Sequence, residues 1–510
     1  MPRAGQEKKR ISPAIAALLI VQIGWTAGCE QSASCAADGE DYSGTDDTDT
    51  ELDTGQEDLD GPPIAGDSDD FCDTQSEAVF VFTSQDSLSI ADPALARFLI
   101  EHERPVFPTV RPREFLNYYD FGYQPDGEGK LRVDARLREL DDEGAFDLQI
   151  GVVAPQMTAH ERRPLNLTIA VDTSESMSTA PIQRAKQCCV AIAGSLRAGD
   201  TVSLVSWNAE QPVLLETHTV SGASDAILVG HCNALAAGGS TDPHAGLSRA
   251  YDLAEDAFSP ERADRVILLS DGGANVDPAE LDRIEIAAED DGDGSILLVA
   301  AGIGDEADPT CYDDASMRRV AAAGGGPYLF VDSAEEAAFA FGPSFSSHVE
   351  IAARDVRVEL SLPPGFEMPE LHGDEQPRDP DEVRPQQLAA GGALVFHRRV
   401  ESCAPELVSL DGEVRVEVSF EDPLTREPAG VEILTTLGDL LDEDPAPLLE
   451  GGAVLAYAEA LQDLSELSGQ AALDRIGQAR AEVQAAAAAL PNDAQLREID
   501  ELLEMYGDQF

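Results

Sequence analysis

The sequence predicts an α/β fold whose centre is a doubly wound, mostly parallel sheet. From about Pro164 to Phe345, short apolar runs alternate with stretches of helical character, the pattern of repeated strand–helix–strand units. The run from Leu165 to Val171 indicates a buried strand, and a polar motif follows it at a strand-to-helix turn. The right-handed crossover rule then places helices on both faces of the sheet, with the carboxyl ends of the strands on one side.

The individual elements follow from the same alternation. The expected strands are Leu165–Val171, Thr201–Trp207, Arg265–Ser270, Ser295–Gly302 and Pro327–Val331. The expected helices cover about Ala180–Arg197, Ala223–Leu235, Pro243–Ala257, Pro278–Glu289, Ala315–Ala323 and Ala334–Phe341.

The motif behind the first strand reads Asp-Thr-Ser-Glu-Ser from Asp172 to Ser176. Asp172, Ser174 and Ser176 present one carboxylate and two hydroxyls at spacing i, i+2, i+4. Hard oxygens of this kind suit Mg²⁺, which takes few protein carboxylates. An open α/β sheet binds its ligands at this end of the strands. The motif therefore predicts a cation site.

Two later segments supply further oxygen ligands. A glycine-hinged loop, Gly238 to Asp242, offers Thr241, and the strand ending at Ser270 is followed by Asp271. Aspartates at such positions can also serve only as helix caps. Three segments in this order favour a metal site over simple capping.

At these residues the chain resembles the von Willebrand factor type A domain, with its metal-ion-dependent adhesion site. The resemblance implies coordinating positions at Asp172, Ser174, Ser176, Thr241 and Asp271. It also implies that the serines and the threonine bind the metal directly and that the aspartates act largely through water. The expected ion is Mg²⁺, with Mn²⁺ or Ca²⁺ as alternatives. Glu175 departs from the family, which usually has glycine there, and its extra carboxylate bears on metal preference and ligand charge.

The N-terminus carries the features of an export signal over residues 1–28. Basic residues precede an apolar stretch from Ile15 to Trp25, which is too short to span a bilayer. The following Ala-Gly-Cys sequence resembles a bacterial lipoprotein signal, which implies lipidation of Cys29. Plain secretion is the alternative. An aspartate after the lipidated cysteine would resemble an inner-membrane retention signal of some bacteria; Glu30 stands there instead, which favours the outer membrane. No later segment is long and apolar enough for a transmembrane helix.

Residues 29–78 are expected to form an acidic, disordered tether. The segment from Glu30 to Glu77 holds 17 acidic residues and no lysine or arginine, too much charge for a packed core. Diffuse calcium binding is the alternative to a plain spacer. The whole chain has a formal charge of −63. Such a surface repels polyanions, which excludes nucleic acid as a partner.

Three further regions flank or follow the central domain of residues 164–346. Residues 79–163 contain an Asn-Tyr-Tyr cluster, Asn117 to Tyr119, that resembles the N-terminal flank of a bacterial subfamily of von Willebrand factor A lipoproteins. We expect its aromatics to form a packed core rather than a ligand platform. Residues 347–436 predict a β-rich domain. Residues 437–510 predict a helical tail, with breaks near Gly469 and Pro491.

Eight cysteines leave the disulfide pattern open. If Cys29 carries lipid, seven remain, so at least one stays free or pairs between chains. Two pairs are plausible, and two thiols are expected to be buried and unpaired. The plausible pairs are Cys35 with Cys72 and Cys311 with Cys403; the expected buried thiols are Cys188 and Cys189.

The sequence favours a binding protein over an enzyme. A metal with an open coordination position can be completed by an acidic side chain of a protein partner. The alternative is a structural envelope scaffold whose metal only stabilises the loops. A metal-dependent hydrolase is the weaker alternative, because the sequence holds no nucleophile elbow, phosphate loop or zinc motif.

Overall fold

A computed structural model describes most of the chain beyond the predicted tether. The described residues are 74–510 except 83–87, 107–109, 127–128, 141, 143, 209, 241–242, 273–275, 290–294, 307–308, 310–311 and 370–385. The predicted signal, nearly all of the predicted tether and the lipidation site at Cys29 lie outside these residues. They stay predictions.

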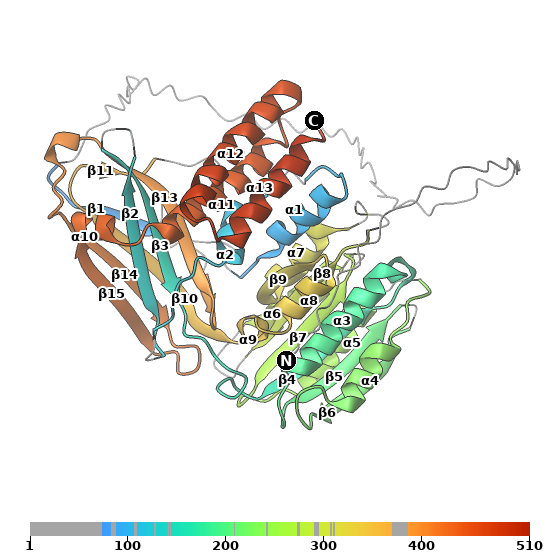
Figure 1. Ribbon diagram of the computed structural model, residues 1–510. Helices are drawn as coiled ribbons and strands as arrows, with labels where there is room; N and C mark the ends of the chain where they lie inside the picture. The colour runs from blue at the N-terminus through green and yellow to red at the C-terminus, as the bar shows by residue number, and fades with distance from the viewer. Residues whose placement is uncertain are drawn as a thin grey trace, which may run out of the picture. The chain divides into compact units, whose positions relative to one another are not determined.

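A six-stranded sheet forms the core of the domain in the middle of the sequence, at the lower right of Figure 1. Its order is β6-β5-β4-β7-β8-β9, and all neighbours are parallel except the pair β5 and β6. The strands are β4 (Leu165–Asp172), β5 (Thr201–Trp207), β6 (Val213–Thr219), β7 (Ala263–Ser270), β8 (Ile296–Ile303) and β9 (Gly325–Val331). The predicted fold class is confirmed. The antiparallel edge strand β6 was not among the expected strands.

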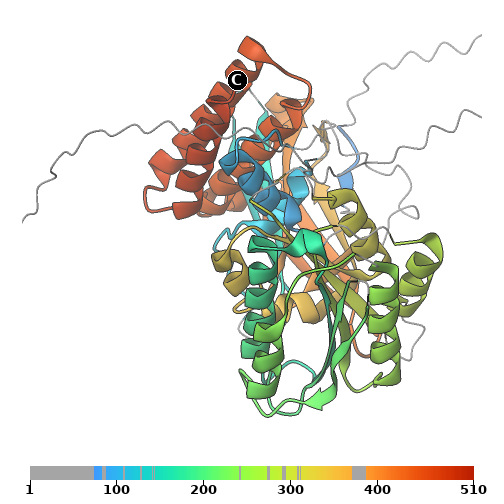
Figure 2. The ribbon, with the colours of Figure 1, turned by 90° about the vertical axis from the view of Figure 1, so that its right-hand side faces the viewer.

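Helices cover both faces of this sheet (Figure 2). One face carries α3 (Ala180–Ser195), α4 (Ala226–Ala234), α8 (Ala334–Ala340) and α9 (Phe345–Val349). The other carries α5 (Pro243–Asp256), α6 (Pro278–Ala288) and α7 (Asp314–Ala323). Along β4, Ile169 belongs to the first core and Ala170 to the second, as expected for a strand with alternating side chains. A strand buried on both faces needs the continuous apolar run that the sequence has.

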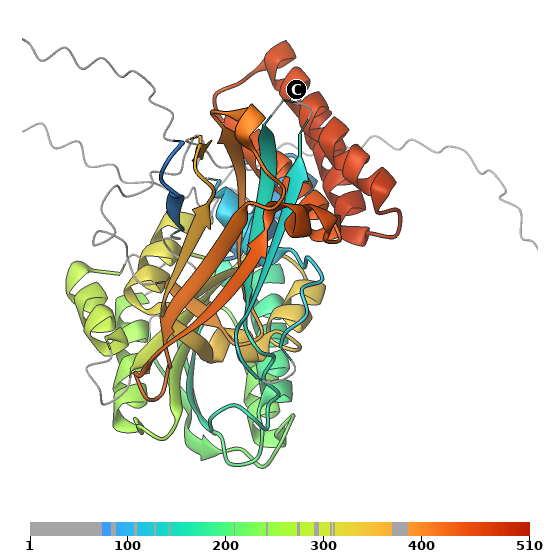
Figure 3. The same ribbon diagram turned by 90° about the vertical axis from the view of Figure 1, so that its left-hand side faces the viewer.

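The two segments that flank this domain pair with each other. One sheet has the order β11-β13-β3-β2 and belongs to the sandwich that faces the viewer in Figure 3. In this sheet Phe396 lies opposite Ile150. The other has the order β1-β10-β14-β15, with β12 also paired to β10. Leu148 and Val358, from different sheets, share one apolar core. The strands are β1 (Ala78–Phe82), β2 (Arg132–Glu139), β3 (Ala145–Val153), β10 (Ile351–Leu362), β11 (Phe366–Glu367), β12 (Gln386–Ala389), β13 (Ala393–Ser402), β14 (Glu413–Glu421) and β15 (Pro428–Thr436).

The regions expected at 79–163 and 347–436 therefore build one β-sandwich between them. The central domain is inserted between its two halves.

The C-terminal region is helical. It contains α10 (Leu437–Asp442), α11 (Ala446–Asp463), α12 (Gly469–Ala489) and α13 (Ala494–Gly507), and the last three lie side by side (Figure 1). Two helices of the N-terminal flank, α1 (Ala91–Glu101) and α2 (Pro112–Tyr118), pack against them. Phe115 and Tyr457 meet edge to face at 5.4 Å between ring centroids. Within the described residues, every helix is too short or too polar to cross a bilayer.

One disulfide corrects the expected thiol pattern. Cys189 on α3 is bonded to Cys232 on α4, with their Cα atoms 5.7 Å apart, so Cys189 is not a free thiol. The two helices pack together, which brings the residues within disulfide reach. Cys188 is buried and free, as expected. Cys403 forms a disulfide, but Cys311, Cys35 and Cys72 lie outside the described residues, so those pairings stay predictions.

Gly451 lies where α11 packs tightly against the sandwich. A Cβ atom there would lie 1.8 Å from Oε1 of Gln149, a fully buried residue of β3. Gln149 cannot easily move, because its amide donates to Tyr123 and to the Pro447 carbonyl and accepts from His397, all at 2.8 Å. The neighbouring Gly452 has only ordinary contacts with His397, at 3.6 Å or more.

Substitution of the two glycines should have opposite effects. Gly451→Ala forces Gln149 out of its hydrogen bonds and should lower the free energy of unfolding by about 1–3 kcal/mol. Gly452→Ala is the matched control, and better helix propensity should raise that free energy by about 0.5–1 kcal/mol. Denaturant unfolding of both variants measures the difference. Equal effects would contradict this packing.

Candidate metal site

The carboxylate at the end of β4 is held from two sides. Asp172 is the last residue of the strand and is fully buried. Its Oδ1 accepts from the Ser174 backbone N–H at 2.9 Å, and its Oδ2 accepts from the Ser270 hydroxyl at 2.9 Å. Ser270 ends the neighbouring strand β7. The sheet register therefore fixes the orientation of this side chain.

The two serines of the motif lie together. A single 3₁₀ turn, η1 (Glu175–Met177), bends the chain so that the hydroxyls of Ser174 and Ser176 are 2.9 Å apart. Ser174 is buried, whereas Ser176 is exposed. The pair thus places two oxygen ligands between the buried carboxylate and the surface.

The glycine loop is fastened to the motif by backbone hydrogen bonds. The Gly238 N–H donates to the Thr173 carbonyl at 2.9 Å, and the Glu175 N–H donates to the Gly239 carbonyl at 3.0 Å. Gly238 and Gly239 have φ values of 153° and 89°, which favour glycine. Asn208, just beyond β5, donates its amide to the Gly238 carbonyl at 2.8 Å. Thr241 itself lies outside the described residues, so its place at the site stays a prediction.

Asp271 completes the described part of the site electrostatically. It follows Ser270 directly and is partly buried. Burial, and after it the negative charge of Asp271, raise the pKa of Asp172 to about 6. Two carboxylates this close disfavour each other's ionised form unless a cation lies between them. The charge distribution therefore fits a bound cation.

The donor set also fits the expected ion. The described residues bring Asp172, Ser174 and Ser176 together, with Asp271 close enough to act on the charge of Asp172. Hydroxyl and carboxylate oxygens are the ligands of Mg²⁺ and similar hard cations. No cluster of three or more His, Cys, Asp or Glu side chains suited to a metal occurs among the described residues. A site here depends on its serines.

Two residues that support the site were not expected. Ser270 holds Asp172, and Asn208 holds the glycine loop. The sequence did contain a signal for Ser270, because it is the polar residue that ends the apolar run of β7. No pattern pointed to Asn208, because its role depends on a loop 30 residues later in the chain.

The fold and these strand ends define a known class of domain. Residues 165–330 match the family model of the von Willebrand factor type A domain. The chain thus carries such a domain between the two halves of its sandwich.

Among curated proteins, the chain is similar to uncharacterized protein YfbK of Escherichia coli (strain K12), at 26% identity over 280 residues. That match covers 53% of this chain and 48% of YfbK. Uncharacterized protein sll0103 of Synechocystis is 24% identical over 242 residues, which cover 46% of this chain and 55% of that protein. The chain spans about half the length of the curated relatives that it matches.

Solved structures with this domain are also similar. A von Willebrand factor type A protein from Catenulispora acidiphila matches with a TM-score of 0.43 at 17% identity, over 70% of this chain and 87% of that one. The ArnB paralog VWA2 from Sulfolobus acidocaldarius matches with a TM-score of 0.36 at 14% identity, over 74% and 97% of the two chains.

The role of Asn208 can be tested without metal. Asn208→Ala removes one hydrogen bond to the glycine loop and should lower stability by about 1 kcal/mol. Amide exchange at Gly238 and Glu175 should become faster, because their N–H groups hold the same loop. Asn233→Ala is the matched control, since that amide donates to the Val229 carbonyl on the exposed side of α4. Unchanged exchange in Asn208→Ala would contradict the assignment.

Proposed function

We propose that this protein captures a protein partner through a divalent cation at the end of the central sheet. The cation, Mg²⁺ or alternatively Mn²⁺ or Ca²⁺, is held by Asp172, Ser174, Ser176, Thr241 and Asp271. When bound, it supplies an open coordination position that a partner's acidic side chain fills. The observation that carries this proposal is the convergence of a buried carboxylate and two serine hydroxyls beside Asp271.

The protein prepares this site in advance. Ser270 keeps the Asp172 carboxylate turned toward the motif, and Asn208 keeps the glycine loop against it. A site whose ligands are already placed loses little conformational freedom when it binds. The exposed Ser176 marks the side from which a partner approaches.

The same proposal places the protein in the bacterial envelope, on the outer membrane. Residues 1–28 act as the signal, Cys29 carries the lipid, and residues 29–78 act as the tether. The Cys189–Cys232 disulfide supports export, because disulfides persist in oxidising compartments. The acidic surface supports a protein partner rather than nucleic acid.

A structural scaffold is the second candidate. The glycine loop is already tied to the motif by backbone hydrogen bonds, so a cation here can serve stability alone. Catalysis is a weaker candidate than partner capture or a scaffold role, because serines and aspartates without an activating base make a poor catalytic set.

Metal binding is the first test. Added Mg²⁺ or Mn²⁺ should stabilise the wild type by about 3 kcal/mol at a hundredfold excess over Kd, because the ion binds only the folded state. Asp172→Ala should abolish this stabilisation. Asp252→Ala, which removes an exposed carboxylate on α5, is the control and should behave as the wild type. Thermal unfolding with and without EDTA measures the effect. Equal stabilisation of Asp172→Ala and the wild type would refute the site.

Partner capture is the second test. The protein, bound to beads, should retain a partner from envelope fractions in Mg²⁺ and release it in EDTA. Asp172→Ala should capture nothing, because the bridging cation is lost. Capture that persists in EDTA would sink the adhesion proposal. Metal-dependent stability without metal-dependent capture would favour the scaffold.

A further inference from the structure

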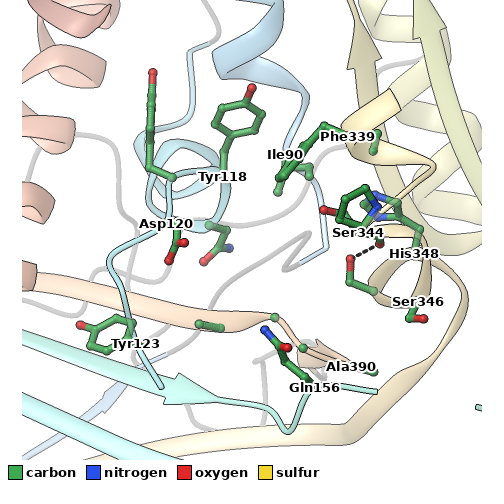
Figure 4. A pocket seen from close by; sticks show the side chains of 18 of the residues that line it. Ile90, Tyr118, Asp120, Tyr123, Gln156, Phe339, Ser344, Ser346, His348 and Ala390 are labelled. Atoms are coloured by element: carbon green, nitrogen blue, oxygen red, sulfur yellow. Dashed lines mark hydrogen bonds between the residues drawn. The ribbon is translucent and has the colours of Figure 1, made fainter. Parts of the chain in front are cut away.

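A cavity of about 520 Å³ lies where the central domain, the aromatic segment after α2 and the sandwich meet. Its walls come from α8 and α9, from residues near Tyr118 and from the start of β13. Figure 4 shows Tyr118 and Asp120 on one side, Gln156 on another, and Ser344 and His348 on a third. A cavity of this size is typical of small-molecule sites. Asp172, Ser174 and Ser176 do not line it.

Aromatic rings are presented to this cavity in fixed positions. The Tyr118 hydroxyl donates to Glu336 at 2.9 Å and accepts from Arg97 at 3.1 Å. The Tyr123 hydroxyl accepts from Gln149 at 2.8 Å. Phe339 is 53% exposed, unusually open for a ring of this size. We expected the aromatic segment to be a packed core; two of its rings also face a cavity.

One imidazole on the cavity wall carries no charge. His348 is 6% exposed, and burial lowers its pKa to about 4, so the ring is neutral near pH 7. It adds to the uncharged lining of the cavity.

The charges of the lining select against anionic ligands. Among the described residues no lysine or arginine lines the cavity, so a phosphate or carboxylate would meet no countercharge. Of its carboxylates, Glu336 pairs with Arg97 at 2.8 Å, and the exposed Asp120 accepts from the Gly122 N–H at 2.9 Å. Amides and hydroxyls make up much of the remaining polar lining, including Gln156, Ser344 and Ser346.

We propose that this cavity binds a neutral carbohydrate of one or two sugar rings. The apolar face of a sugar ring packs on Phe339 and the tyrosines, whose ring faces carry negative charge density. Sugar hydroxyls bond to Gln156 and to the serines of the lining. This site is independent of the cation site, so the two proposals stand or fall separately.

Binding of neutral disaccharides tests the proposal. Maltose, cellobiose and N,N′-diacetylchitobiose are titrated at millimolar concentrations into the full chain in EDTA, followed by ligand-observed NMR. Glucose 6-phosphate and choline serve as anionic and cationic probes. We expect at least one disaccharide to bind and both charged probes to fail.

Two variants connect that binding to the cavity. Gln156→Ala and Phe339→Ala should each weaken the disaccharide about tenfold, equal to about 1.4 kcal/mol. Both side chains are exposed, so their loss leaves the fold intact. Leu434→Ala, an exposed apolar change on β15, is the control that should bind as the wild type. Failure of all three disaccharides, binding of choline alone, or full binding by Phe339→Ala would overturn the proposal.

Discussion

The structure depends on the burial of α1 between the central domain and the helical tail. All residues of this helix except Arg97 and Glu101 are buried. At its start, Asp92 pairs with Arg318 of α7, which also binds the buried Glu114 of α2 at 2.5 Å. Buried carboxylates are costly without a cation, and burial together with Glu114 raises the pKa of Asp92 well above its usual value. Arg318 offsets this cost only while the three helices stay together.

Arg97 of α1 also links the central domain to the helical tail through ion pairs. It reaches Asp332 at 2.6 Å and Glu336 at 2.8 Å in the central domain, and Glu498 of α13 at 3.3 Å. The apolar core continues across these ion pairs, since residues of β9, α1 and α13 belong to one cluster. The flanks and the tail are therefore packed onto the central domain rather than strung along it, and the cavity beside α8 exists because of this packing.

Local sequence patterns were enough to predict the strands of the central domain, but not the pairing of the flanking segments into a sandwich. The strands β4, β7 and β8 are buried throughout, so their apolar runs were visible in the sequence. The edge strand β6 is only partly buried and was not among the expected strands. The motif at Asp172 was found because its ligands are adjacent, whereas Asn208 acts on a loop far along the chain. Sandwich pairing and the Cys189–Cys232 bond likewise depend on distant partners, which no single segment reveals.

The insertion of the central domain into the sandwich has a consequence for the order of events during folding. Ile150 of β3 must find Phe396 of β13, about 250 residues later in the chain. β2 and β3 are synthesised before the central domain and pair with each other as a hairpin. The other edge of β3 stays unpaired until β13 is available. The central domain, whose contacts are more local, can close first and shorten the distance between the waiting partners. Its early closure would limit the time in which that unpaired edge is exposed to other chains.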